Sequence, residues 1–211
     1  MIRNFKKNKI LWFLNALLSF IAALTGVFNT GIYDRVVSGT IMPGVFAQDL
    51  MTLVASCIIL VLIFRTREAD IIRQMVILGF LGFLFYAYGI YVIERLYNAL
   101  YFLYMAIFGL SFYSIVYGVV SIREKAVRTV SQSRFIRNAA AGFLLFNALM
   151  FYPLWIGQLL PLIRAAERIE FLYSIYILDL CFIMPAFIII AVMTLRNNGL
   201  GILLTPSLCV M

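Results

Sequence analysis

Long apolar runs alternate with short polar connections along the whole chain. A helix needs about 20 apolar residues to cross the ~30 Å hydrocarbon core of a bilayer. Six runs approach or exceed that length, at about 10–28, 49–64, 71–93, 96–122, 139–160 and 171–195. A chain in lipid must satisfy its backbone hydrogen bonds internally, so each run is predicted to be a helix. The pattern predicts an all-α, polytopic transmembrane helix bundle of about six spans, a single integral membrane domain over 1–211.

The two ends of the chain need separate interpretation. A basic segment precedes the first run, as in a signal peptide, but the run exceeds the usual h-region of about 7–15 residues. No clear cleavage site follows, so we expect an uncleaved first span. The tail 196–211 is apolar but too short for the ~30 Å core. It is compatible with a re-entrant segment, an interfacial segment or the start of a seventh span.

Composition agrees with a chain embedded in lipid. Hydrophobic residues make up 64% of the sequence and charged residues only 12%, against about 25% in soluble domains. The net charge is +8, and thirteen of the 17 Lys and Arg residues fall in the two terminal segments and in the connections around 65–73 and 123–137. The positive-inside rule then predicts that both termini are cytoplasmic. The basic balance is therefore a topology signal, and we expect no binding to nucleic acid.

Asp179 is the acid that the sequence places deepest in an apolar run. It lies eight residues after Phe171, about 12 Å along a helix. A carboxylate at that depth costs roughly 2.5–3.5 kcal/mol on insertion scales, so it is expected to face the bundle interior. Tyr176 is its nearest hydroxyl on the same face, and Pro185 predicts a kink on the other side. Two interpretations stay open, namely a proton or cation site and a structural hydrogen-bond anchor.

Other polar and aromatic residues extend this hypothesis. Asp49 opens the second predicted span and is interpreted as its helix cap, with ligand binding as the alternative. Tyrosines gather at the ends of the third and fourth spans, which is typical of an interfacial aromatic belt. The alternative is an outward-facing, aromatic-lined polar cavity around Asp179, formed with Tyr176, Tyr101, Tyr104, Arg95 and Glu94.

The sequence disfavours several kinds of chemistry. The chain contains no histidine, which excludes histidine-ligated haem or zinc and histidine acid–base catalysis. The three cysteines stand far apart, and neither a P-loop nor a G-x-S-x-G motif is present. We therefore expect no enzyme activity, no cofactor and no metal site.

Two segments resemble bacterial multi-pass membrane proteins of no assigned activity. They are YNALYFLYMAIFGLS, at 97–111, and YILDLCFIMPAF, at 176–187. The resemblance implies a bacterial-type cytoplasmic membrane as the location and implies no chemistry.

Two functions remain after these exclusions. The first is a non-catalytic sensor, accessory or interaction subunit in the lipid bilayer, whose basic connection 123–137 meets anionic lipid or a protein partner. The alternative is a transporter or channel-like protein that carries a proton or small cation by way of Asp179. The sequence identifies neither a substrate nor an oligomeric state.

Overall fold

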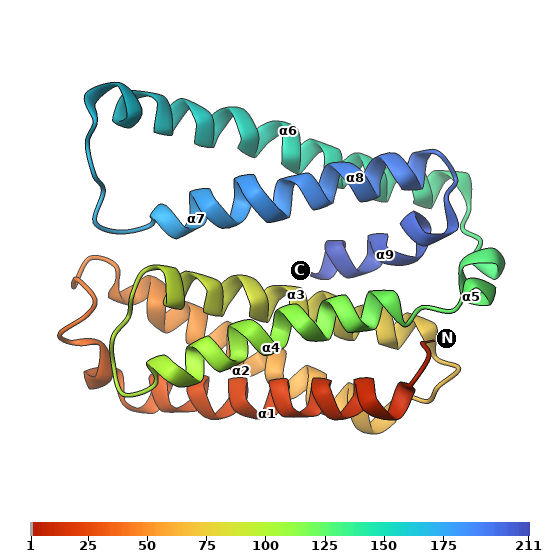
Figure 1. The fold of residues 1–211 in the computed structure, drawn as a ribbon, viewed down its shortest axis with the longest axis horizontal. Helices are drawn as coiled ribbons and strands as arrows, with labels where there is room; N and C mark the ends of the chain where they lie inside the picture. Colours follow the sequence, from red (N-terminus) through yellow and green to blue (C-terminus); the bar gives the residue numbers. More distant parts are fainter. Residues whose placement is uncertain (1) are drawn as a thin grey trace. The chain divides into compact units, whose positions relative to one another are not determined.

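The computed structural model describes residues 2–211, which form helices joined by short connections (Figure 1). Within this range, six helical segments are long and apolar enough to cross a membrane. The predicted all-α, multi-pass transmembrane fold is therefore confirmed. The chain divides into two compact units, one extending to Arg123 and including Val210–Met211, and the other covering Glu124–Cys209.

Four long helices build the first unit. They are α1 (Phe5–Phe28), α2 (Met42–Arg65), α3 (Ile71–Ile93) and α4 (Tyr101–Val120), with a short 3₁₀ helix at Thr30–Tyr33. α1 packs against α2 and α4, and α3 packs against the same two helices, which closes the bundle. The side chains of the core, such as Leu81 and Ile107, are completely buried between these helices.

The helix boundaries differ from the predicted spans most clearly in α2. This helix begins at Met42, whereas the sequence predicts a span starting at 49. Pro43 and Gly44 suggest a loop, but proline suits the first turn of a helix because the N–H group there has no intrahelical partner. α1 also begins earlier than predicted, at Phe5.

The second unit contains the fifth and sixth spans. α5 (Glu124–Thr129) precedes α6 (Arg134–Ala165), whose N-terminus is capped by the Ser133 hydroxyl. α6 extends beyond the predicted span 139–160 at both ends. Pro161, where a helix end would be expected, lies inside the helix. The sixth span consists of α7 (Tyr173–Leu178), a π-helical turn at Asp179–Ile183 and α8 (Met184–Leu195). α6 packs along α8.

The tail forms a short helix, α9 (Gly199–Val210). Its 12 residues correspond to about 18 Å, well under the ~30 Å hydrocarbon core. The hydroxyls of Thr194 and Thr205 lie 2.7 Å apart and join α9 to α8. A Cβ atom at Gly201 would come within 2.7 Å of the Met193 Cβ, so the two helices approach closely at that glycine.

Candidate functional site

The carboxylate of Asp49 lies buried inside the first unit. Asp49 is only 2% exposed, and it receives hydrogen bonds from two tyrosines. The Tyr33 hydroxyl donates to Oδ2 over 2.7 Å, and the Tyr91 hydroxyl donates to Oδ1 over 2.9 Å. The three residues come from the 3₁₀ helix, α2 and α3. The acid therefore joins three elements that are separate in the sequence.

Two further tyrosines complete what we call the Asp49 cluster, which comprises Asp49, Tyr33, Tyr88, Tyr91 and Tyr104. The hydroxyls of Tyr33 and Tyr104 lie 3.3 Å apart. The ring of Tyr104 packs edge-on against Tyr91, with centroids 5.2 Å apart, and the ring of Tyr88 lies 5.8 Å from that of Tyr104. Every member of the cluster is at most 2% exposed.

The cluster reaches the end of the bundle through Asn98, in the connection between α3 and α4. The Asn98 amide donates to the Tyr104 hydroxyl over 3.2 Å. Burial, more than the charges of Tyr91 and Asp49, raises the pKa of Tyr33 far above its ordinary value. The Tyr33 hydroxyl therefore keeps its proton at neutral pH and remains a donor to the carboxylate.

Gly26 of α1 provides the space that the carboxylate occupies. A Cβ atom at this position would overlap Oδ2 of Asp49 and come within 2.6 Å of the Tyr33 hydroxyl oxygen. Only glycine, which has no side chain, lets α1 pass this close to a charged group. Gly26 thus belongs to the site although it carries no functional group.

The sequence interpretation of Asp49 as a helix cap is wrong. Capping requires a position at the helix start, and α2 begins seven residues earlier, at Met42. The carboxylate faces the bundle and binds side-chain hydroxyls of other elements. The feature of the sequence that could have indicated a buried acceptor is the number of tyrosines at the ends of the third and fourth spans. A buried tyrosine hydroxyl needs a hydrogen-bond partner.

Asp179 occupies a different environment in the second unit. It is 7% exposed and accepts a hydrogen bond of 2.7 Å from Nε1 of Trp155, on α6. Tyr176 does not bond to it, because its hydroxyl donates to Oε1 of Gln158 over 2.8 Å. A π-helical turn begins at Asp179, just before Pro185, where the sequence predicts a kink. Tyr152 donates to the Leu180 carbonyl within that turn.

The predicted polar cavity draws its residues from both units. Asp179 and Tyr176 belong to the second unit, whereas Glu94, Arg95, Tyr101 and Tyr104 belong to the first. Tyr104 is part of the Asp49 cluster. Tyr101 instead donates to the Val92 carbonyl and packs against Tyr97. The joint cavity therefore stays a prediction.

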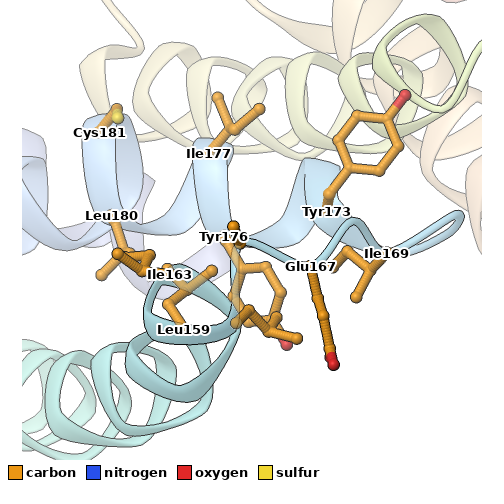
Figure 2. Close-up of a pocket in the computed structure, with 11 residues that line it drawn as sticks. Leu159, Ile163, Glu167, Ile169, Tyr173, Tyr176, Ile177, Leu180 and Cys181 are labelled. Atoms are coloured by element: carbon orange, nitrogen blue, oxygen red, sulfur yellow. The ribbon is translucent and has the colours of Figure 1, made fainter.

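An open pocket of about 560 Å³ lies in the second unit, between α6 and the start of the sixth span (Figure 2). Leu159 and Ile163 of α6 face Leu180, and the carboxylate of Glu167 lies at the rim. Its lining is otherwise almost entirely apolar, from Leu159, Leu162, Ile163, Ala166, Ile169, Tyr173, Tyr176, Ile177, Leu180 and Cys181. Such a lining suits a hydrocarbon chain.

Comparison with known proteins gives no relative, because no family model, curated protein or solved structure matches the chain. Within residues 2–211, no three His, Cys, Asp or Glu side chains gather in a group that fits a metal ion. The site must therefore be interpreted from its own contacts.

Proposed function

We propose that the protein is a non-catalytic sensor, accessory or interaction subunit of a membrane, with both termini on the cytoplasmic side of a bacterial-type cytoplasmic membrane. The observation that carries the proposal is that both deeply placed acids bond directly to neighbouring elements. Asp49 binds Tyr33 and Tyr91, and Asp179 binds Trp155. Polar side chains used in this way fix the packing of membrane helices. The surface of the bundle is then left for lipid and partner proteins.

The basic segment 123–137 is the proposed contact with anionic lipid or with a protein partner. Arg123 pairs with Glu68, and Arg128 pairs with Glu124, in both cases with exposed side chains. Exposed ion pairs contribute little to stability, so these arginines remain accessible to other anions. Next to exposed Arg134, the Phe135 ring is 83% exposed at the start of α6. A cation beside an exposed aromatic ring suits the interface between headgroups and acyl chains.

A thermal-stability measurement in vesicles tests this contact. We expect anionic phosphatidylglycerol to raise the melting temperature above that in phosphatidylcholine, because each Lys or Arg near an anionic surface contributes about 1 kcal/mol. The double variant Arg128→Gln/Arg134→Gln is expected to lose most of the rise. Arg164→Gln/Arg168→Gln is the matched control, because both of its arginines are exposed near the other end of α6. Equal losses in the two variants would contradict a binding segment at 123–137.

A second candidate function, transport of a proton or small cation through Asp179, is favoured by the π-helical turn at that residue. Single π turns within α-helices occur frequently at functional sites. In proteoliposomes, Asp179→Asn would then abolish flux without lowering the melting temperature. If flux is unchanged and the variant melts at a lower temperature, Asp179 is a packing residue.

A further inference from the structure

One face of α1 is polar although it is completely buried. Asn8, Trp12, Asn15 and Ser19 each have 0% exposure. Their spacing of four, three and four residues places them on a single helical face. The same face continues through Ala22 and Ala23 to Gly26, beside the Asp49 carboxylate. From Asn8 to Gly26 the distance along the helix is about 27 Å, close to the ~30 Å hydrocarbon thickness.

Buried polar residues of α2 and α4 extend this face into what we call the polar column. The column comprises Asn8, Trp12, Asn15, Ser19, Thr52, Ser56, Ser111, Ser114 and the Asp49 cluster. The Asn15 amide donates to Ser111 Oγ over 2.8 Å, and the Ser19 hydroxyl lies 3.3 Å from Asn15 Oδ1. The Tyr88 hydroxyl donates to the Ser19 carbonyl over 3.0 Å, which links the column to the Asp49 cluster.

Four atoms of the column have no protein partner. They are Asn8 Oδ1, Trp12 Nε1, Ser56 Oγ and Ser114 Oγ, all in completely buried residues. Such atoms are rare, and the usual partner of a buried polar atom that binds no protein group is an ordered water molecule. Gln74 Oε1, near the start of α3, is a further buried atom without a hydrogen-bond partner. Unpartnered donors and acceptors therefore occur in the half of the bundle away from Asp49.

A purely structural column would not have this pattern. Polar side chains that hold membrane helices together bind one another or the backbone, as Asn15 and Ser111 do. Thr25 and Thr66 also satisfy their hydroxyls on carbonyls four residues earlier in their own helices. Ser56 and Ser114 could bond in the same way but do not. Their hydroxyls therefore remain available for hydrogen bonds to water.

We propose that the first unit binds a file of water molecules along the polar column and conducts protons through it, with Asp49 as the group that holds the proton in transit. Intramembrane acids that face a bundle interior are typical of proton relays. The titratable groups that surround Asp49 are Tyr33, Tyr88, Tyr91 and Tyr104, from the 3₁₀ helix, α3 and α4. One end of the column lies at Tyr104, which bonds to Asn98, and the other lies near Asn8 and Gln74.

The proton transfer balances without any further reactant. One O–H bond of a hydronium ion breaks, and a new O–H bond forms on a carboxylate oxygen of Asp49. Tyr33 or Tyr91 then rotates its hydroxyl from donor to acceptor, which a phenol allows. The reverse transfer returns the proton to water on the other side and regenerates the carboxylate.

Proton flux into proteoliposomes under a potassium-diffusion potential tests this proposal, with an enclosed pH-sensitive dye as the probe. We expect flux from the unaltered protein and its loss in Asp49→Asn and in Asn15→Leu. Asn147→Leu is the matched control, because Asn147 lies on α6 in the second unit and binds only its own helix, at the Phe143 carbonyl. This control is expected to keep the flux.

A second variant addresses the case in which those proteins fail to fold. Ser56→Ala/Ser114→Ala removes two hydroxyls without protein partners, so we expect normal melting and a reduced flux. No flux from the folded, unaltered protein would overturn the proposal, as would unchanged flux in the folded Asp49→Asn protein. The lipid-dependent melting of the basic segment does not involve Asp49, so that experiment and the flux experiment can succeed or fail separately.

Discussion

The two acids within the spans, Asp49 and Asp179, are stabilised in different ways. Asp49 lies in the first unit and receives two tyrosine hydroxyls from different elements. Asp179 lies in a π-helical turn of the second unit and binds the indole of a neighbouring helix. Asp49 sits closer to a polar connection in the sequence, yet it is the more deeply buried of the two. The depth of an acid in an apolar run therefore does not measure its burial in the bundle.

The largest expected effect separates the two acids directly. Asp49→Ala removes two buried hydrogen bonds to a carboxylate and leaves the Tyr33 and Tyr91 hydroxyls only their longer contacts, 3.3 Å to the Tyr104 hydroxyl and 3.2 Å to the Val45 carbonyl. The change should lower the free energy of unfolding by about 2–5 kcal/mol. Asp179→Ala removes the acceptor of an indole that is only half-buried, on Trp155, and should cost less. Chemical unfolding in detergent micelles measures both. If Asp179→Ala is the more destabilising variant, Asp179 and not Asp49 contributes more to the stability of the fold.

A pair of glycine substitutions, one in each unit, is expected to have the next largest effect. Gly26→Ala places a methyl group against the Asp49 carboxylate and should destabilise the protein by roughly 1–3 kcal/mol. Gly142→Ala, on α6, meets no atom within 4 Å and should stabilise its helix by up to about 1 kcal/mol. Melting temperatures that shift in opposite directions would support the close approach of α1 to Asp49. A neutral Gly26→Ala would count against it.

Trp155→Phe tests the partner of Asp179 with a smaller effect. The change keeps an aromatic ring beside Tyr176 but removes the indole N–H donor. We expect a loss of about 1 kcal/mol in the free energy of unfolding, the usual net value of one hydrogen bond. Full stability of the Trp155→Phe protein in the same chemical unfolding measurement would contradict this assignment.

The smallest effect is expected at Tyr176, which the sequence analysis pairs with Asp179. Its hydroxyl binds the exposed Gln158, where water can replace either partner. Tyr176→Phe should therefore change the free energy of unfolding by about 0.5 kcal/mol or less. A loss several times larger, measured by the same unfolding assay, would mean that Tyr176 supports Asp179 after all.

The sequence was sufficient for the class of fold because helix length and hydropathy determine it. It also indicated Asp179 and Tyr104 as polar features of the spans. It did not reveal that Trp155 binds Asp179, because their contact depends on how α6 and the π-helical turn pack. The role of Asp49 was missed for two reasons. Pro43 suggested a loop, so the helix was expected to begin at Asp49. Gly26 has no side chain, so nothing in the sequence indicated that α1 passes beside the carboxylate.

The proposed water along the polar column is tested most directly by the two tryptophans, the only ones in the chain. Trp12 Nε1 has no protein partner, whereas Trp155 Nε1 donates to Asp179. Exchange of the two indole protons with deuterated water can be followed by NMR, with Trp155→Phe assigning the signals. We expect the completely buried Trp12 proton to exchange faster than the Trp155 proton, because water lies beside it. A protected Trp12 proton beside a freely exchanging Trp155 proton would contradict the polar column.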